Sequence, residues 1–236
     1  MIDSKYTSYP LRVLNGEIVA CEYVKQACKR YLDFFNKYTF DEKAVDRVVT
    51  FCSHLKHFQG KSSGKPFILS DFQFWIICAV YGFKDDNGRR VCKNVYIELS
   101  RKNGKSFFAA ALALYHLIGD NENAAEVEVV ANSAKQAGIL FSMCKYLCEG
   151  IDKRNKFFKR YRDKIKFDKT KSFLQVLSSD ANTNDGWNSS MYVVDEYHSA
   201  PNSGMYDVLK SSQGMREQPM SIVITTAGFN LFGPCY

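Results

Sequence analysis

The chain has 236 residues and a formal net charge of +7, with 46% hydrophobic and 24% charged residues. These proportions are those of an ordinary globular protein, so they exclude disordered, collagen-like and low-complexity chains. The longest apolar run, 107–118, is too short to span a membrane, and no basic-then-apolar leader opens the chain. The eight cysteines form no C-x-x-C pair. We therefore expect no zinc site, no disulfide framework and no membrane contact, but a reduced cytoplasmic protein.

The first part of the chain is predicted to be helical. Apolar residues at helical spacing predict a helix over 17–38. A capping box from Thr39 to Glu42 predicts the start of a second helix. Ser70 and Gln73 have the same spacing and predict the start of a third helix.

From residue 91 onward, short apolar strands alternate with helices. Helices are predicted over 107–117 and 134–148. The predicted strands are 94–99, 126–131, 164–168, 172–177, 191–194 and 221–225. This alternation predicts an α/β fold with a mostly parallel central sheet and helices on both faces. We expect two parts, an N-terminal helical elaboration over 1–90 and the α/β core over 91–236.

The segment Ser-Arg-Lys-Asn-Gly-Lys-Ser at 100–106 follows a predicted strand and opens a helix, which is the position of a phosphate-binding loop. Backbone N–H groups at a helix N-terminus bind phosphate oxygens, Lys105 supplies a positive charge, and the Ser106 hydroxyl can ligate Mg²⁺. The usual pattern has a glycine where this chain has Leu99. A plain surface turn is therefore the alternative.

A second signal lies where the strand 191–194 runs into two carboxylates. Phosphoryl transfer needs an acid at a strand end to complete the Mg²⁺ shell, and a neighbouring group to activate water. Asp195 suits the first role and Glu196 the second. The alternative is a solvated Asp-Glu turn. Both motifs follow strands, and ligands of open α/β sheets bind at the carboxyl ends of strands.

The segment 151–171 holds ten basic and three acidic residues, so its net charge of +7 equals that of the whole chain. Concentrated charge of this kind indicates a polyanionic partner, and we take Lys159, Arg160 and Arg162 as candidates for contacts with DNA phosphates. Four aromatic residues are interleaved with these cations. The alternative is a solvated surface whose aromatic rings belong to the core.

Four motifs in order resemble one known family. They are Phe-Ile-Leu-Ser-Asp-Phe-Gln at 67–73, the loop 100–106, Val-Val-Asp-Glu-Tyr-His at 193–198 and Ile-Thr-Thr-Ala-Gly at 224–228. Over about residues 66–236 the chain is similar to the ATPase domain of the bacteriophage large terminase subunit. The resemblance implies a P-loop NTPase fold and Mg²⁺-dependent ATP hydrolysis that moves double-stranded DNA into a procapsid. It also implies a portal protein and a small terminase subunit as partners, a homo-oligomeric ring, and work in the host cytoplasm.

The resemblance also implies residue roles. It implies ATP binding by Gln73, Ser100, Arg101, Lys102, Asn103, Gly104, Lys105 and Ser106, Mg²⁺ binding by Ser106 and Asp195, catalysis by Glu196 and Arg101, and coupling of nucleotide state to DNA by Thr225, Thr226 and Gly228.

Some of these positions have a second interpretation. Gln73 could equally be a helix cap, and the two threonines could be plain strand residues. Arg216, just before the last strand, could reach a neighbouring subunit as a trans arginine, or could be a solvated arginine. His198 is interpreted as a surface residue.

Members of the family also carry a nuclease domain. After the coupling motif this chain shows no separate group of carboxylates, so we expect the nuclease domain to be absent from it and predict no nuclease activity. Two other functions fit part of the pattern. One is a helicase-like P-loop translocase. The other is a DNA-binding assembly scaffold that does not hydrolyse ATP, because Leu99 departs from the usual loop.

Overall fold

The computed structural model describes residues 3–178 and 186–236, and it divides into two units. The first unit takes its described residues from Met1–Ser53 and Ile68–Cys92, and the second takes them from His54–Phe67 and Lys93–Tyr236. The segment 54–67 therefore packs with the second unit, although the sequence placed it in the helical part.

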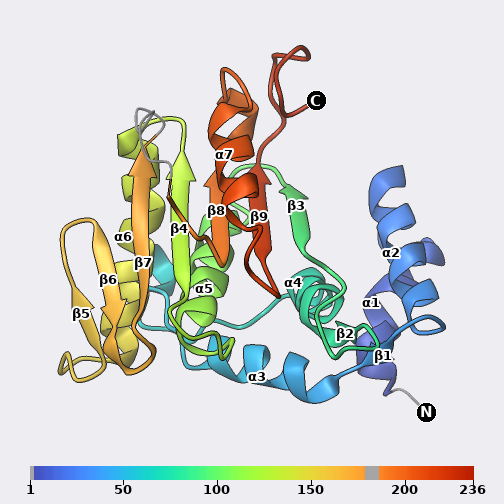
Figure 1. Ribbon diagram of the computed structural model, residues 1–236. Helices are drawn as coiled ribbons and strands as arrows, with labels where there is room; N and C mark the ends of the chain where they lie inside the picture. The colour runs from blue at the N-terminus through green and yellow to red at the C-terminus, as the bar shows by residue number, and fades with distance from the viewer. Residues whose placement is uncertain (1–2, 179–185) are drawn as a thin grey trace. The chain divides into compact units, whose positions relative to one another are not determined.

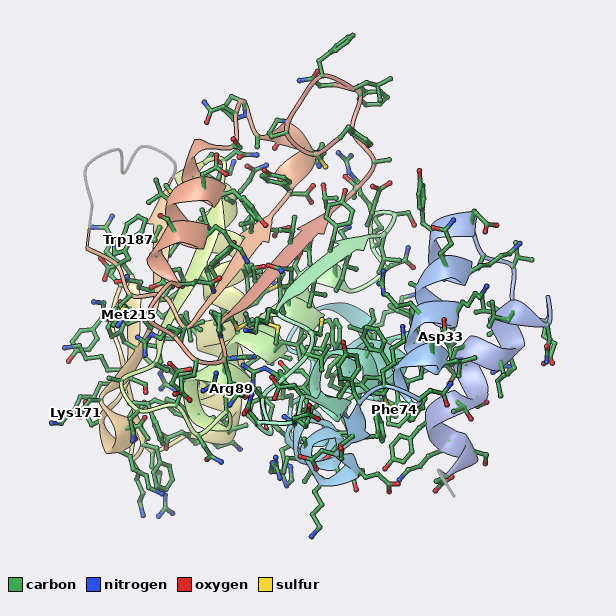
Figure 2. All side chains as sticks on the ribbon, turned by 45° about the vertical axis from the view of Figure 1, so that its right-hand side comes forward. Asp33, Phe74, Arg89, Lys171, Trp187 and Met215 are labelled. Carbon is green, nitrogen blue, oxygen red and sulfur yellow. The ribbon has the colours of Figure 1, made fainter. Side chains whose placement is uncertain are left out.

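The first unit consists of short helices and one small antiparallel strand pair. Its elements are α1 (Ser4–Leu14), α2 (Glu22–Phe34), β1 (Thr39–Phe40), α3 (Glu42–Ser53), α4 (Asp71–Ile77), a π-helical turn (Cys78–Gly82) and β2 (Phe83–Lys84). Aromatic rings fill its core. Phe74 lies among the crowded side chains of this unit (Figure 2) and stacks on Tyr6, with 6.0 Å between ring centroids.

Helix α1 was not predicted, and it contains a proline in its interior. Pro10 has no N–H, so the carbonyl of Tyr6 loses its intrahelical partner. The Tyr31 hydroxyl of α2 donates to this carbonyl at 2.9 Å. A hydrogen bond from a distant helix thus satisfies the group that the proline leaves open.

One of the two predicted capping boxes is wrong and the other is confirmed. Thr39 lies in strand β1, and the N-terminal turn of α3 is capped instead by Asp41, whose Oδ1 accepts from the backbone N–H of Ala44 at 2.9 Å. At α4 the box forms as expected, because Gln73 Oε1 accepts from the backbone N–H of Ser70 at 3.0 Å.

The second unit is built on a seven-stranded sheet in the order β3-β9-β8-β4-β7-β6-β5. Its strands are β3 (Asn94–Glu98), β4 (Glu126–Ala131), β5 (Phe158–Arg160), β6 (Lys164–Phe167), β7 (Ser172–Ser178), β8 (Met191–Asp195) and β9 (Met220–Thr225). Its helices are α5 (Lys105–Ile118), α6 (Ala134–Ile151) and α7 (Gly204–Ser212). The first five strands in the sheet order are parallel, and β6 pairs antiparallel with both β7 and β5. This confirms the predicted, mostly parallel α/β core.

Helices cover both faces of this sheet, with α5 and α6 on one face and α7 on the other (Figure 1). Every residue of β8 and β9 is buried, as expected for central parallel strands. Leu209 of α7 packs in one cluster with Val130, Tyr192, Val194 and Val223. The alternate strand residues face the other way, toward α5 and α6.

Segment 54–67 is anchored beside the beginning of α5. Its two ends approach each other through a bridge between Lys56 and Pro66. The His57 ring stacks on Phe107, with 4.7 Å between centroids, and Phe67 meets the same ring edge-on at 4.8 Å. Among the described residues, no helix is both long and apolar enough to cross a membrane.

Candidate active site

The carboxyl ends of four adjacent parallel strands bring the predicted motifs together. Register fixes the arrangement, because Glu98 of β3 pairs with Thr225 of β9, and Asp195 of β8 pairs with Ile224 of β9 and Ala131 of β4. The loop after β3, the acids after β8 and the threonines at the end of β9 therefore lie at one edge of the sheet.

The loop between β3 and α5 has the backbone expected of a phosphate-binding loop. Gly104, the N-cap of α5, has φ 76°, and Lys102 has φ 68°, a conformation that is costly without a glycine. Lys105 is only 7% exposed, and its Nζ lies 3.4 Å from the Ser100 carbonyl oxygen. Arg101 is exposed. The N-terminus of α5, with its unpaired N–H groups, is suited to an anion.

Asp195 and Ser106 meet across this edge, although 89 positions separate them in the chain. The Ser106 hydroxyl lies 3.4 Å from Asp195 Oδ2, at the long end of hydrogen bonding. Asp195 Oδ1 is buried and has no hydrogen-bond partner among the described residues. Burial, followed by the charge of Glu196, raises the pKa of Asp195 to about 6.

These two side chains fit a divalent cation. A hydroxyl and a carboxylate are hard oxygen ligands, and a cation would offset the cost of the buried, unpaired carboxylate oxygen. Within the described part of the chain, no three His, Cys, Asp or Glu side chains gather as a metal cluster. A site with few protein ligands suits Mg²⁺, which keeps waters and binds substrate phosphates.

Glu196 has a left-handed backbone, with φ 54° and ψ 44°. Its carbonyl oxygen accepts from the Asn132 side chain at 3.1 Å, from the Ser199 hydroxyl at 2.9 Å and from the Ser199 N–H at 3.0 Å. Three donors on one carbonyl hold this otherwise unfavourable conformation. Sequence reasoning missed Asn132, although its position directly after β4 was the available signal.

The side chain of Glu196 contacts the end of β9. Its Oε2 lies 3.4 Å from Thr226 Oγ1 and 3.2 Å from His198 Nδ1. The interpretation of His198 as a surface residue is wrong, since its side chain is 19% exposed and its ring contacts Glu196 and Thr225. Thr225 and Thr226 are also buried. The structure thus brings the predicted coupling residues to the predicted catalytic carboxylate.

Gln73 lies in the first unit, where it is 6% exposed and caps α4. The amide oxygen is engaged in the cap by both the N–H and the hydroxyl of Ser70. The capping interpretation is therefore confirmed. The adenine-reading role stays a prediction that involves the amide nitrogen.

The basic segment forms the outer hairpin of the sheet, β5 and β6. Phe158 and Phe167 are buried, as expected if the aromatic rings belong to the core. Phe157 and Tyr161 are exposed, as expected of a surface that contacts a partner. Lys159 pairs with Asp168, and Arg160 donates weakly to a backbone carbonyl. Arg162 is exposed.

Arg216 lies at the opposite edge of the sheet, beside the loops that lead into β4 and β8. Its Nε donates to the Asn188 carbonyl at 2.8 Å, and its Nη1 donates to Glu122 Oε1 at 2.8 Å. Its Nη2 donates to the Ala124 carbonyl at 3.0 Å, and the side chain is 9% exposed. These bonds tie the guanidinium to its own chain. The trans role stays a prediction, and this geometry favours a structural role instead.

We predict that Arg216→Ala lowers the free energy of unfolding by about 1.5 kcal/mol, because it removes the hydrogen bonds of a charged group to Glu122 and to two backbone carbonyls. Arg216→Lys should recover part of that loss, since lysine keeps the positive charge but lacks the planar guanidinium group with its several donors. Urea denaturation measures both changes. The exposed Arg162→Ala is the control and should change stability by less than about 0.5 kcal/mol. Loss of ATP turnover by Arg216→Ala at unchanged stability would instead support the trans role.

Comparison with known proteins shows which family the chain resembles. Residues 71–236 match the family described as the terminase large subunit, ATPase domain. The terminase large subunit of Lactococcus phage p2 is 24% identical over 227 residues, which cover 93% of this chain and 42% of that protein. The large subunit of Enterobacteria phage HK97 is 28% identical over 178 residues, which cover 73% of this chain and 34% of that protein. The chain thus spans less than half the length of these relatives.

One solved structure has a similar fold. The crystal structure of the HK97 large terminase superposes with a TM-score of 0.64 at 25% identity, over 77% of this chain and 37% of that chain. The fold is therefore P-loop NTPase-like. The family match covers well over half of the residues, and the chain belongs to the family of terminase large subunit ATPase domains.

Proposed function

We propose that this chain is the Mg²⁺-dependent ATPase motor of a terminase large subunit, which hydrolyses ATP to move double-stranded DNA into a procapsid. In this proposal it acts as a homo-oligomeric ring, with a portal protein and a small terminase subunit, in the host cytoplasm. The observation that carries the proposal is the meeting of Ser106 and Asp195, 3.4 Å apart, at the N-terminus of α5. A metal-ligand pair next to a phosphate-binding loop is the core of this class of site.

Each residue at this edge has a part in the proposed hydrolysis. The N–H groups of the loop and the charge of Lys105 bind the β- and γ-phosphates. Ser106 and Asp195 would hold Mg²⁺, which, when bound, neutralises charge on the transferred phosphoryl group. Glu196 orients and activates the attacking water, and the exposed Arg101 stabilises the transition state in cis.

Lys105→Ala should weaken ATP binding and abolish turnover, because it removes a charge from the phosphates. Glu196→Gln should keep ATP binding and abolish turnover, because the amide has the same shape but cannot accept the proton of water. Binding of a fluorescent ATP analogue and phosphate release measure the two effects separately. The exposed Lys135→Ala on α6 is the control for loss of a lysine. Equal loss of ATP affinity in both site variants would contradict the role of Glu196.

We also propose that the amide of Gln73 reads adenine while its oxygen caps α4. The two roles use different atoms, since Oε1 accepts from Ser70 and the amide N–H₂ is the donor that adenine requires.

Two substitutions at this residue separate the roles. Gln73→Glu keeps the capping oxygen but loses the amide donor, so it should relax the preference for ATP over GTP while the cap of α4 remains. Gln73→Ala should relax the same preference and also cost about 1 kcal/mol of stability. Competition binding with ATP and GTP gives the first quantity and urea denaturation gives the second. Unaltered nucleotide preference in Gln73→Glu would leave the residue with its capping role alone.

We further propose that the hairpin β5–β6 contacts DNA phosphates through Lys159, Arg160 and Arg162. The charge of this segment and the exposed aromatic rings beside it support the proposal. Contacts of this type do not depend on sequence and weaken as salt displaces them.

Replacing Lys159, Arg160 and Arg162 together by Gln should lower the slope of log affinity against log salt by about 0.9 for each lost phosphate contact. Fluorescence anisotropy with a duplex of arbitrary sequence, titrated at several salt concentrations, measures this slope. The matched control replaces three exposed cations of α2, which are Lys25, Lys29 and Arg30. A slope that stays the same in the hairpin variant, or that falls equally in both, would remove this hairpin from DNA binding.

A further inference from the structure

His198 lies between the catalytic carboxylate and the end of β9, and a single ring nitrogen makes all of its contacts there. Nδ1 is 3.0 Å from Thr225 Oγ1, 3.2 Å from Glu196 Oε2 and 3.4 Å from Thr226 Oγ1. The side chain is 19% exposed. Three polar oxygen atoms therefore surround this one nitrogen within 3.4 Å.

The neighbouring hydrogen bonds determine which atom donates. Thr225 Oγ1 donates its proton to the carbonyl of Thr226 at 3.0 Å and accepts from the backbone N–H of His198 at 3.0 Å. It therefore has only an acceptor site left for the ring. An ionised Glu196 carboxylate also only accepts. Nδ1 must then carry the proton and share it between Thr225 and Glu196.

The ring is also held in place sterically by Gly228, two residues after Thr226. A Cβ atom on Gly228 would lie 2.8 Å from the Cβ of His198, closer than real contacts allow. Its backbone is not in a left-handed region that would by itself require glycine. The absence of a side chain at Gly228 is what allows the chain to pack against His198.

We propose that His198 is a positioning residue that ties the orientation of Glu196 to the segment Thr225–Gly228. Nδ1–H and the Thr226 hydroxyl hold Oε2, which leaves Oε1 for the reacting water. Any shift of the segment after β9 then moves the catalytic carboxylate directly. This inference rests on the proposed function of Glu196 in ATP hydrolysis. It adds a specific physical link between that residue and the coupling motif.

Two substitutions of His198 test which nitrogen matters. The amide nitrogen of Asn occupies the place of Nδ1, whereas that of Gln occupies the place of Nε2. We expect His198→Asn to keep most of kcat, and His198→Gln and His198→Ala to lower kcat by about 10-fold to 100-fold, the scale of a misplaced catalytic group. The Kd for ATP should stay the same in all three, because none removes a phosphate contact. Phosphate release and equilibrium nucleotide binding measure the two quantities on the full chain.

Gly228→Ala gives an independent test that leaves every polar group in place. It should lower kcat in the wild-type background by displacing the imidazole, and it should add little in the His198→Gly background, where neither the imidazole nor the Cβ that it would meet remains. Additive losses in the double variant would show that Gly228 acts without His198 and would overturn the link.

The outcomes separate this inference from the proposed function. If the unmodified chain neither binds nor hydrolyses ATP, the proposed function fails. If it hydrolyses ATP and His198→Gln matches the wild type, or if the Asn and Gln variants lose kcat equally, the assignment of Nδ1 is wrong while the ATPase stands. A raised Kd for ATP with unchanged kcat would also overturn the positioning role.

Discussion

The parallel pairing of β3, β9, β8 and β4 is the constraint on which the site depends. Because these strands run in the same direction, their carboxyl ends meet at one edge, and each contributes a different chemical group. Leu99 donates its N–H to the Thr225 carbonyl at 3.1 Å, so the sheet hydrogen bonding continues to the residue that precedes the loop 100–106. A slip of one residue in this register would turn Asp195 to the other face of the sheet and separate it from Ser106.

Several unfavourable backbone conformations and an unpaired buried oxygen are concentrated at this edge, and the rest of the second unit offsets their cost in stability. Lys102 and Glu196 have positive φ angles, and Asp195 is buried with one oxygen unpaired. Such features persist only where the surrounding structure holds them in place. Here the buried central strands and helix α5, most of whose residues are buried, provide that support. Strain and unpaired charge at one place, next to a helix N-terminus, are the physical marks of a site built for a charged ligand.

Much of the core could be predicted from the sequence, because its signals are local. The alternation of apolar residues located β4 at its observed bounds, and the loop before α5 was recognised from adjacent residues. The features that were missed or wrongly interpreted involve residues whose hydrogen-bond partners lie far along the chain. Helix α1 tolerates Pro10 only because Tyr31 satisfies a carbonyl, and His198 is positioned by Thr225, 27 residues away. Arg216 is held by two loops that no local pattern connects to it. Hydrogen bonds of this kind become visible only when the fold is known.

The central claim is that this edge of the sheet hydrolyses ATP with Mg²⁺, and the most direct measurement is phosphate release by the unmodified chain. The reaction is followed with ATP and Mg²⁺, and again after the metal is removed with EDTA, across a range of protein concentrations. We predict steady release that requires Mg²⁺ and that Asp195→Asn reduces strongly, because the substitution removes the charge that holds the ion. Release that is the same with EDTA, or no release at any concentration while ATP still binds, would contradict it.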